Sequence, residues 1–542
     1  MDASSSQPWW RRFVRLALFT LREEDVTRVE PDELVGFAGG LGAEAFGVTA
    51  AGIAALYPSE LAEHRRSPFL GGRDYLGEIL QAAHREGVKV LARLDPSLAD
   101  APLLEEHPDW FSRTATGEPI AASGLYVTCP NGPYYREFIP EVVRELLRRY
   151  DLDGIWVNGG RFSAWEAGRC FCMNCRRSFA HAAGGPIPSG EWDDPRYGAF
   201  LEWRYRALAE WIGLMRRVKD ERRPDIPLVV ANQVIEPWEF IRAGGWDLDL
   251  WVDAVDVLST EGQRRNVSAW WLAAEAKYLR SLGPDRPRWI TVSYFYPWWR
   301  LYSAPVPENR AWLAQVVANG SSPWIHLNGH ASEVYDRRGL AATRDFYGFL
   351  DREREIYEGA TSEAEIALIF SRRTVDHYGR EWPEARYLDH VRGYYQALSD
   401  AGLNFDVISD TLLDRLDRWR VVVAPNLACL GDEAAAALRA YVERGGGLVA
   451  TFETGHCDPL GATRECPALD GLLGTYLGVR RDGLQSAYLG VAERDHPLLA
   501  GLGDTDLLPL FGSVLYVRAA PDAAGPLTLI PPVRAHGGSD MS

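Results

Sequence analysis

Residues 74–95 read DYLGEILQAAHREGVKVLARLD, and this stretch contains the unit that decides the fold. Its first half has apolar residues at helical spacing between Asp74, a capping residue, and Gly87, a helix terminator. These apolar positions are Leu76, Ile79, Leu80 and Ala83. Its second half, Val88–Asp95, is apolar nearly throughout, as parallel strands buried on both faces are. The stretch therefore predicts an amphipathic helix that leads into a buried parallel strand.

The same alternation of apolar runs and amphipathic stretches extends from Phe13 to about Gly329. Eight such units over about three hundred residues predict a closed (β/α)8 TIM barrel within residues 9–358. An open doubly wound sheet is the alternative, but no glycine-rich phosphate loop follows the strands. The predicted strands are Phe13–Arg22, Glu44–Gly52, Val88–Asp95, Asp153–Asn158, Pro227–Val234, Asp256–Glu261, Arg288–Tyr296 and Pro323–Gly329.

A second α/β series follows the barrel, within residues 363–505. It predicts a smaller flavodoxin-like domain, similar to class I amidotransferases, with an open parallel sheet. Such enzymes need a nucleophilic Cys at a tight strand–helix elbow, and Val423–Cys429 does not read as one, so we interpret this domain as non-catalytic. Residues 506–542 are rich in Pro, Gly and Ala and predict an irregular tail. The predicted strands are Glu365–Phe370, Asn404–Ile408, Arg420–Ala424 and Gly447–Phe452.

The composition excludes several classes of function. A net charge of −17 argues against nucleic-acid and anionic-membrane partners, which attract basic surfaces. No run of eighteen apolar residues occurs, so the sequence predicts no membrane-spanning helix. The odd number of cysteines, seven, and the absence of a secretory apolar region argue against a disulfide scaffold. We therefore expect a cytoplasmic protein.

The predicted barrel strands end in residues suited to sugar chemistry. Active sites of such barrels lie at the carboxyl ends of the strands. Glycoside hydrolysis needs two carboxyl groups that flank the scissile bond, together with donors to sugar hydroxyls and aromatic walls. We therefore predict Asp95 and Glu261 as the catalytic pair. The predicted substrate contacts are Arg93, Asn158, Tyr296, Trp298 and His326.

Each of these residues also has a purely structural explanation. Glu261 could pair with a neighbouring arginine, and Asp95 could shape a turn before a proline. His326 could be a satisfied core histidine, and the aromatic residues could simply pack in the barrel. Position at a strand end favours the functional interpretation for the carboxylates without excluding the structural one.

A cluster of cysteines predicts a metal centre. Cys170, Cys172 and Cys175 form a C-x-C-x-x-C pattern after the fourth strand, and Cys129 lies just before the helix that leads into that strand. Four thiolates can close a tetrahedral Zn²⁺ site, which would be structural because no ligand position stays open. The alternative is a set of reduced, partly buried thiols. We expect no organic cofactor.

The strands, the cysteine pattern and the second domain together resemble the family 42 β-galactosidases, in which a Cys cluster binds zinc and the second domain mediates trimerisation. A closer likeness is to the hypothetical glycosyl hydrolases related to family 151 α-L-fucosidases. The likeness extends over about Trp9 to Gly501. The matching stretches are Gly52–Pro58, Gly72–Asp74, Ala92–Asp95, His107–Phe111, Cys129–Tyr135 and Asp153–Ile155.

Two departures from family 42 bear on the catalytic residues. In family 42 an Asn-Glu pair ends strand four and supplies the acid/base, whereas this chain has Asn158-Gly159. The family nucleophile ends strand seven, where this chain has Tyr296. Only Asn158 is carried over by the resemblance, as a contact to a sugar hydroxyl.

The resemblance implies an exo-acting glycoside hydrolase. The related α-L-fucosidases imply α-L-fucosides among its candidate substrates. The alternatives are a β-galactosidase-like enzyme, a catalytically inactive carbohydrate-binding pseudoenzyme, and a structural oligomer with a vestigial barrel. The resembled families also imply a homo-oligomer, with a trimer favoured, in which the second domain contributes to the interface.

Overall fold

The computed structural model describes residues 7–162, 168–264, 267–330 and 334–532. The chain divides into two compact units. The first comprises Met1–Glu363 with Asp406–Ser409, and the second comprises Ala364–Phe405 with Asp410–Ser542. In the described part of the chain, no helix combines the length and apolarity needed to cross a membrane.

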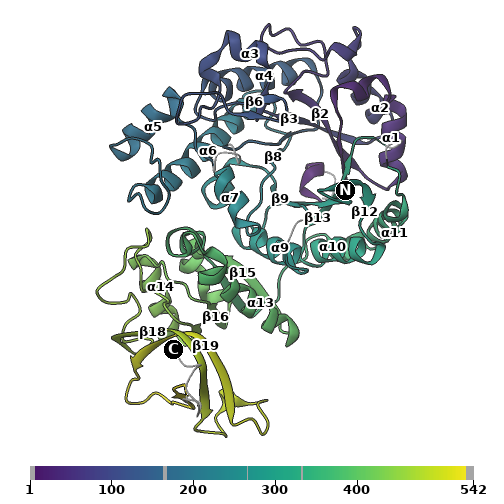
Figure 1. The fold of residues 1–542 in the computed structure, drawn as a ribbon. Coiled ribbons are helices and arrows are strands. Elements are labelled where there is room, and N and C mark those ends of the chain that lie inside the picture. Colours follow the sequence, from purple (N-terminus) through teal and green to yellow (C-terminus); the bar gives the residue numbers. More distant parts are fainter. Residues whose placement is uncertain (1–6, 163–167, 265–266, 331–333, 533–542) are drawn as a thin grey trace, which may run out of the picture. The chain divides into compact units, whose positions relative to one another are not determined.

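Eight parallel strands form the first unit, in the order β8-β7-β3-β2-β1-β13-β10-β9 (Figure 1). A parallel bridge between Val229 and Val257 joins the two ends of this order and closes the ring. The fold is a (β/α)8 barrel, and each of its strands overlaps a predicted range; β9 ends one residue later than predicted, and β13 begins one residue earlier. The strands are β1 (Leu16–Thr20), β2 (Ala45–Gly52), β3 (Lys89–Asp95), β7 (Gly154–Val157), β8 (Leu228–Val230), β9 (Leu258–Gly262), β10 (Arg288–Ser293) and β13 (Ser322–Asn328).

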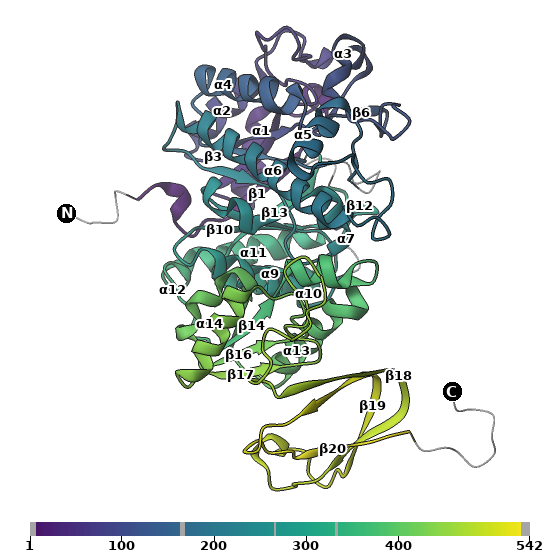
Figure 2. The same ribbon diagram turned by 90° about the vertical axis from the view of Figure 1, so that its left-hand side faces the viewer.

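Helices surround the barrel and connect successive strands (Figures 1 and 2). The helix and strand predicted over residues 74–95 form as expected. The Asp74 side chain accepts a hydrogen bond from Gly77 N at 3.0 Å at the start of the helix, and Gly87 lies just beyond its end with φ 71°. The longer helices are α1 (Pro31–Gly40), α2 (Tyr75–Arg85), α4 (Ile139–Arg149), α5 (Met173–Ala183), α6 (Tyr197–Asp220), α9 (Trp271–Leu282), α10 (Val306–Ala318) and α11 (Arg338–Arg352). Shorter helices are α3 (Ala101–Glu106), α7 (Trp238–Gly244), α8 (Leu248–Trp251) and α12 (Arg354–Tyr357).

Tryptophan side chains fill the barrel interior. Trp156, Trp289 and Trp324 belong to one buried cluster, with ring centroids 5.0 Å and 5.8 Å apart in the two pairs that include Trp324. Trp10, near the N-terminus, packs into the same cluster. Because large apolar side chains occupy the interior, polar side chains can be accommodated only toward the strand ends.

The part of the chain that follows the barrel contains a second parallel sheet in the order β15-β14-β16-β17. This order places the first strand between the second and the third, which is the flavodoxin-like arrangement expected from the sequence. Helices α13 (Asp389–Asp400) and α14 (Asp432–Glu443) accompany it. The strands are β14 (Ile366–Phe370), β15 (Phe405–Ser409), β16 (Val421–Ala424) and β17 (Gly447–Ala450).

The segment after β16 turns more sharply than the sequence indicated, because Asn426 adopts φ 44°. Its side chain is fully occupied: Oδ1 accepts from Glu453 N at 3.0 Å, and Nδ2 donates to Arg386 O at 2.8 Å. A buried amide side chain therefore sits at this turn.

The prediction of an irregular tail over residues 506–542 is wrong for part of that range. β19 (Leu507–Arg518) and β20 (Leu527–Ile530) pair antiparallel with β18 (Thr475–Val491). Pro509 and Gly512 hide the strand pattern in the sequence, but Gly512 lies beside a register shift where its φ of 91° is accommodated. The three strands form a sheet in the second unit (Figure 2).

Candidate functional site

Both predicted catalytic carboxylates lie at the carboxyl ends of barrel strands. Asp95 is the last residue of β3, and Glu261 is the last but one of β9. β7 and β8 lie between these strands in the ring. The structure thus places the two residues at the same mouth of the barrel, on separate strands.

Asp95 is the centre of a hydrogen-bond network. Its Oδ1 accepts from Ser97 Oγ at 2.5 Å and from Ser97 N at 3.3 Å. Its Oδ2 accepts from Asn158 Nδ2 at 2.8 Å and from Arg93 Nη2 at 3.2 Å. Four donors, one of them a guanidinium group, fix the orientation of the carboxylate. Because the Asp95 oxygens accept all four bonds, this arrangement suits a nucleophile or a base better than a proton donor.

Gly159, the residue after Asn158, has no space for a side chain. Its φ is 68°, and a Cβ atom here would lie 2.7 Å from Asp95 Oδ1 and 2.9 Å from Ser97 Oγ. The Asp95 carboxylate therefore fills the space that the second residue of an Asn-Glu pair would need.

Three buried polar atoms near the strand ends have no hydrogen-bond partner among the described residues. They are Arg93 Nε on β3, Gln233 Oε1 after β8 and His326 Nδ1 on β13. Such atoms are rare in folded proteins and indicate a missing partner, such as water or a ligand. Arg93 and His326 were predicted as substrate contacts, whereas Gln233 was missed. Gln233 lies after β8, the fifth strand, and Asn158 lies after β7, the fourth. Its position near a strand end was the one signal in the sequence that could have indicated a substrate contact.

His326 is held as a neutral imidazole. Its Nε2 lies 3.0 Å from Thr20 Oγ1, and its ring contacts Phe295 edge-on. Burial, with further contributions from Arg93 and Arg300, lowers the pKa of His326 to about 3. The imidazole can therefore exchange hydrogen bonds with a sugar hydroxyl without carrying a charge.

Strand β10 leads into a hairpin of β11 (Phe295–Tyr296) and β12 (Trp299–Ser303). The Tyr296 hydroxyl donates to Glu308 Oε2 at 2.6 Å, and burial together with this bond raises its pKa to about 12. Trp298, in contrast, is 84% exposed. The structural explanation therefore fits Tyr296, whereas Trp298 is not barrel packing and presents its ring to solvent.

Two further glutamates, not predicted from the sequence, lie close to β8 and β9. Glu236, in the segment after β8, is 3% exposed, and its Oε2 accepts from Ser268 N at 3.3 Å. Glu275 lies on α9 and is completely buried, and burial raises its pKa to about 7. Glu236 reads as a turn residue before a proline, and Glu275 lies within an amphipathic helical pattern, so neither gave a distinct signal.

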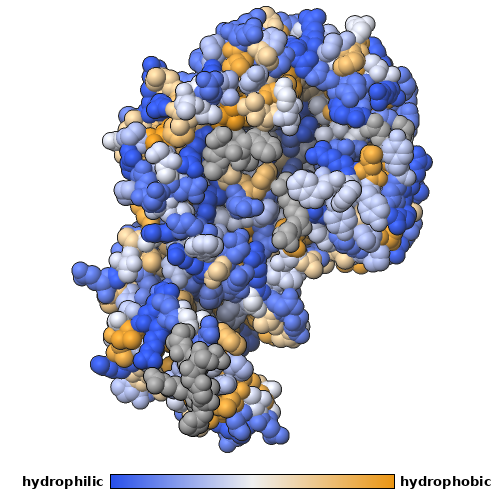
Figure 3. Space-filling view, in the orientation of Figure 1, coloured by the Kyte–Doolittle hydropathy of each residue, from blue (hydrophilic) through white to orange (hydrophobic). Residues whose placement is uncertain are grey.

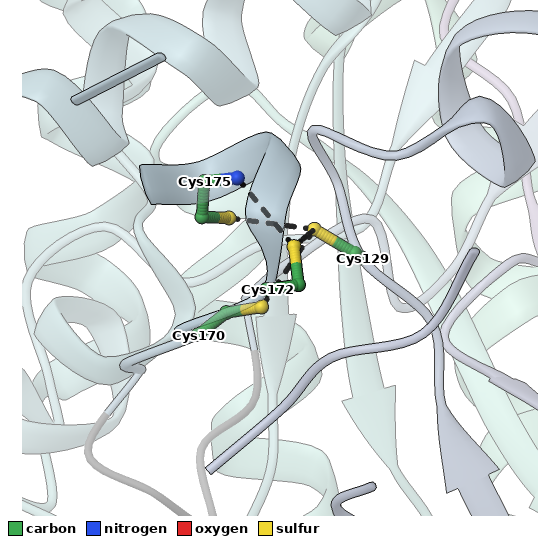
Figure 4. A group of neighbouring side chains, drawn as sticks. All are labelled: Cys129, Cys170, Cys172 and Cys175. Carbon is green, nitrogen blue, oxygen red and sulfur yellow. Dashed lines mark hydrogen bonds between the residues drawn. The ribbon is translucent and has the colours of Figure 1, made fainter. Parts of the chain in front are cut away.

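The four cysteines of the predicted metal centre converge (Figure 4). Cys129 Sγ lies 3.8 Å, 3.5 Å and 3.4 Å from the sulfurs of Cys170, Cys172 and Cys175. A tetrahedral zinc with bonds of about 2.3 Å needs sulfurs about 3.8 Å apart. All four side chains are buried, and all four sulfurs lie within 4.8 Å of one another. The donor set and its spacing therefore fit Zn²⁺.

Local hydrogen bonds orient the sulfur atoms of this centre. Cys172 caps α5, and its Sγ accepts from Cys175 N at 3.4 Å. Asn131 Nδ2 donates to Cys175 Sγ at 3.5 Å. Amide donors and a helix N-terminus stabilise negative charge on sulfur. The centre joins the loop before α4 to the segment after β7, and its four protein ligands leave no position for a substrate.

Two family models match separate parts of the chain. The model described as hypothetical glycosyl hydrolase 6 matches residues 31–159, which contain the Asp95 network. The model described as β-galactosidase trimerisation domain matches residues 364–493, which contain the second parallel sheet and all of β18. The two matches correspond to the two units that the structure separates.

The chain is also similar to named proteins. The β-galactosidase BgaH of Haloferax lucentense is 24% identical over 77% of this chain and 71% of its own length. The chain covers 64% of two β-galactosidases of Geobacillus. Among solved structures, a β-galactosidase from Bacillus circulans sp. alkalophilus has a TM-score of 0.77 at 17% identity, over 96% of this chain and 83% of that one. The α-L-fucosidase isoenzyme 2 from Paenibacillus thiaminolyticus has a TM-score of 0.73 at 19% identity, over 96% and 74%. These structures share the fold.

The buried carboxyl of Glu275 predicts a pH-dependent stability. Its pKa rises from the ordinary 4.5 to about 7 on folding, so the folded protein retains a proton that the unfolded chain releases between these values. We therefore expect wild type to lose up to about 3 kcal/mol of unfolding free energy, relative to Glu275→Gln, as the pH rises from 5 to 8. Urea unfolding of both proteins at both pH values measures this difference. Identical pH dependence of the two proteins would contradict it.

Proposed function

We propose that this chain, a glycoside hydrolase of the family 42-like superfamily, removes a terminal sugar from a glycoside. The observation that carries the proposal is the set of polar groups at one end of the barrel. An oriented carboxylate, Asp95, lies at the same mouth as a second carboxyl group and three polar atoms that lack partners. A pyranose supplies several hydroxyl groups that can satisfy such atoms.

The proposed catalytic pair divides the chemistry between Asp95 and Glu261. Asp95, which accepts four hydrogen bonds, acts as the ionised member, either attacking the anomeric carbon or activating a water molecule. Glu261 protonates the glycosidic oxygen of the leaving group. Retention corresponds to carboxyl groups about 5 Å apart, and inversion to about 6.5–9.5 Å.

Substrate recognition is proposed to use the unpartnered atoms. Arg93 Nε donates to a hydroxyl oxygen, Gln233 Oε1 accepts from a hydroxyl, and His326 Nδ1 exchanges a hydrogen bond with another. Asn158 Nδ2 donates a hydrogen bond to Asp95 Oδ2, so Asn158 contributes by orienting that carboxylate. Trp298 offers an exposed indole face to a sugar ring.

The names of the curated relatives support a β-galactoside as substrate, and one structural neighbour supports an α-L-fucoside. We propose the galactoside first, because it rests on several relatives. One observation favours a different function: Gly159 and Tyr296 stand where family 42 has its catalytic glutamates. A carbohydrate-binding pseudoenzyme is therefore the second candidate.

We also propose that Cys129, Cys170, Cys172 and Cys175 hold a structural zinc ion and that the chain forms a trimer in the cytoplasm. The sulfur geometry supports the metal, and the seven free cysteines support a reducing compartment. The match to a trimerisation domain supports the oligomer. Figure 3 shows apolar side chains, in orange, at the surface of the molecule. The exposed apolar side chains of β18 and β19 include Leu477, Val479, Phe511 and Val517.

The catalytic proposal predicts the kinetics of Asp95→Asn. We expect wild type to hydrolyse an aryl β-D-galactoside, with aryl α-L-fucoside and α-L-arabinoside as the comparison substrates. The Asn variant should lose a factor of about 10²–10⁴ in kcat, because the amide can neither attack nor take up a proton. Glu261→Gln should show a similar loss. Asp253→Asn, at a carboxylate that is 92% exposed, is the control. Wild-type turnover that survives Asp95→Asn would exclude Asp95 from catalysis, and sugar binding without turnover would favour the pseudoenzyme.

The zinc proposal predicts about one zinc ion per chain in protein purified without chelator, measured by elemental analysis. Cys172→Ser should lose the metal and lower the melting temperature, since the centre joins two loops. The chemical step should change little, because the centre is closed to substrate. Cys466→Ser, at an exposed cysteine, should change neither property. Metal-free wild type with full stability would refute the proposal.

The trimer proposal predicts a particle of three times the 60.6 kDa chain mass in light scattering coupled to size exclusion. Phe511→Glu should dissociate it, because a charge would be buried at an apolar interface. Leu498→Glu, at a side chain that is 80% exposed outside these strands, is the matched control. A monomeric wild type at micromolar concentration would contradict the proposal.

A further inference from the structure

One buried carboxylate connects the ends of two neighbouring barrel strands. Glu275 lies on α9 with no exposed surface. Its Oε1 accepts from Ile235 N at 2.8 Å and from Glu236 N at 3.3 Å, both in the segment after β8. Its Oε2 accepts from Thr260 Oγ1 at 2.5 Å, in β9. A single side chain thus fixes both segments at the barrel mouth.

The hydrogen bond between Glu275 and Thr260 lies one residue away from Glu261, the proposed proton donor. Thr260 immediately precedes Glu261, and Glu261 N donates to Asn232 O at 2.9 Å, at the end of the β8 segment. The Glu275 carboxylate also accepts from Trp271 Nε1 at 2.7 Å, one turn earlier on its own helix. This tryptophan bond holds the carboxylate in one rotamer, so its distance to both segments is fixed.

Stability alone does not explain this side chain. Burying a carboxyl group is costly, and an apolar residue of similar size at such a position is often as stable or more so. An apolar side chain would, however, leave the N–H groups of Ile235 and Glu236 without this acceptor. The segment after β8 would then lose the contact that holds it against β9. The carboxylate is therefore suited to fixing geometry at the mouth.

We propose that Glu275 is a positioning residue that sets where Glu261 stands relative to the segment after β8. The inference rests on the proposed glycosidase function and adds a residue outside the substrate-contacting set. Glu275 acts through Thr260 and the Ile235–Glu236 backbone, and it does not touch the sugar. Its loss should lower kcat more than it changes KM, because the proton donor moves while the hydroxyl contacts on β3 and β13 remain.

Three variants separate positioning from stability. Glu275→Leu removes the acceptor and leaves three buried N–H donors without it, so we expect a folded protein with a lower melting temperature and a kcat at least about 100-fold lower. Glu275→Gln keeps one amide oxygen for the three N–H donors, and its kcat should stay within about fivefold of wild type. Rescue by glutamine but not by leucine is the signature of a positioning acceptor.

Thr260→Val is the milder test, and it remains informative if Glu275→Leu fails to fold. It removes the hydroxyl that donates to Glu275 Oε2 and, at 3.4 Å, to Asn232 O, and we expect kcat to fall about tenfold with KM unchanged. Thr343→Val is the matched control, since Thr343 is equally buried but bonds to Gly339 O within its own helix. Wild-type kcat in Thr260→Val, or in folded Glu275→Leu, would overturn the inference. An inactive wild type would instead overturn the proposed function, so the two failures are distinct.

Discussion

Closing eight parallel strands around a tryptophan-filled interior is the constraint on which this molecule depends. Trp156, Trp289 and Trp324 occupy the interior, so the polar residues of the strands collect where the strands end. Asp95, Glu261 and His326 therefore share one mouth although they are far apart in the sequence. The same closure brings β8 beside β9, which allows one helix residue to hold both.

The sequence predicted the barrel well, because buried parallel strands are continuous apolar runs and each run was recognisable on its own. It also located Asp95, Glu261 and the cysteine cluster, whose signals are local. It did not reveal Glu275, whose partners lie fifteen or more residues away along the chain apart from Trp271. The sequence also did not predict β19. Pro509 and Gly512 interrupt its strand pattern, and the strand forms because it pairs with β18. Contacts between residues far apart in the chain leave no local pattern in the sequence from which they could be predicted.

The two units relate differently to the resembled proteins. The second parallel sheet has the flavodoxin-like strand order that the sequence predicted. In the turn after β16, both the oxygen and the nitrogen of the Asn426 side chain form hydrogen bonds. In the barrel, the overall form agrees with that of the solved β-galactosidases, and the polar residues at the mouth are arranged around Asp95. A shared fold does not by itself fix the chemistry.

The crowding at Gly159 limits how this site can change. A side chain there would collide with the Asp95 carboxylate and with Ser97, and its backbone already has a positive φ. A side chain at position 159 therefore requires the Asp95 carboxylate or Ser97 to shift, and such a shift would disturb the present network. The choice of residue at position 159 and the orientation of Asp95 are thus coupled, so a change at one of these positions affects the other.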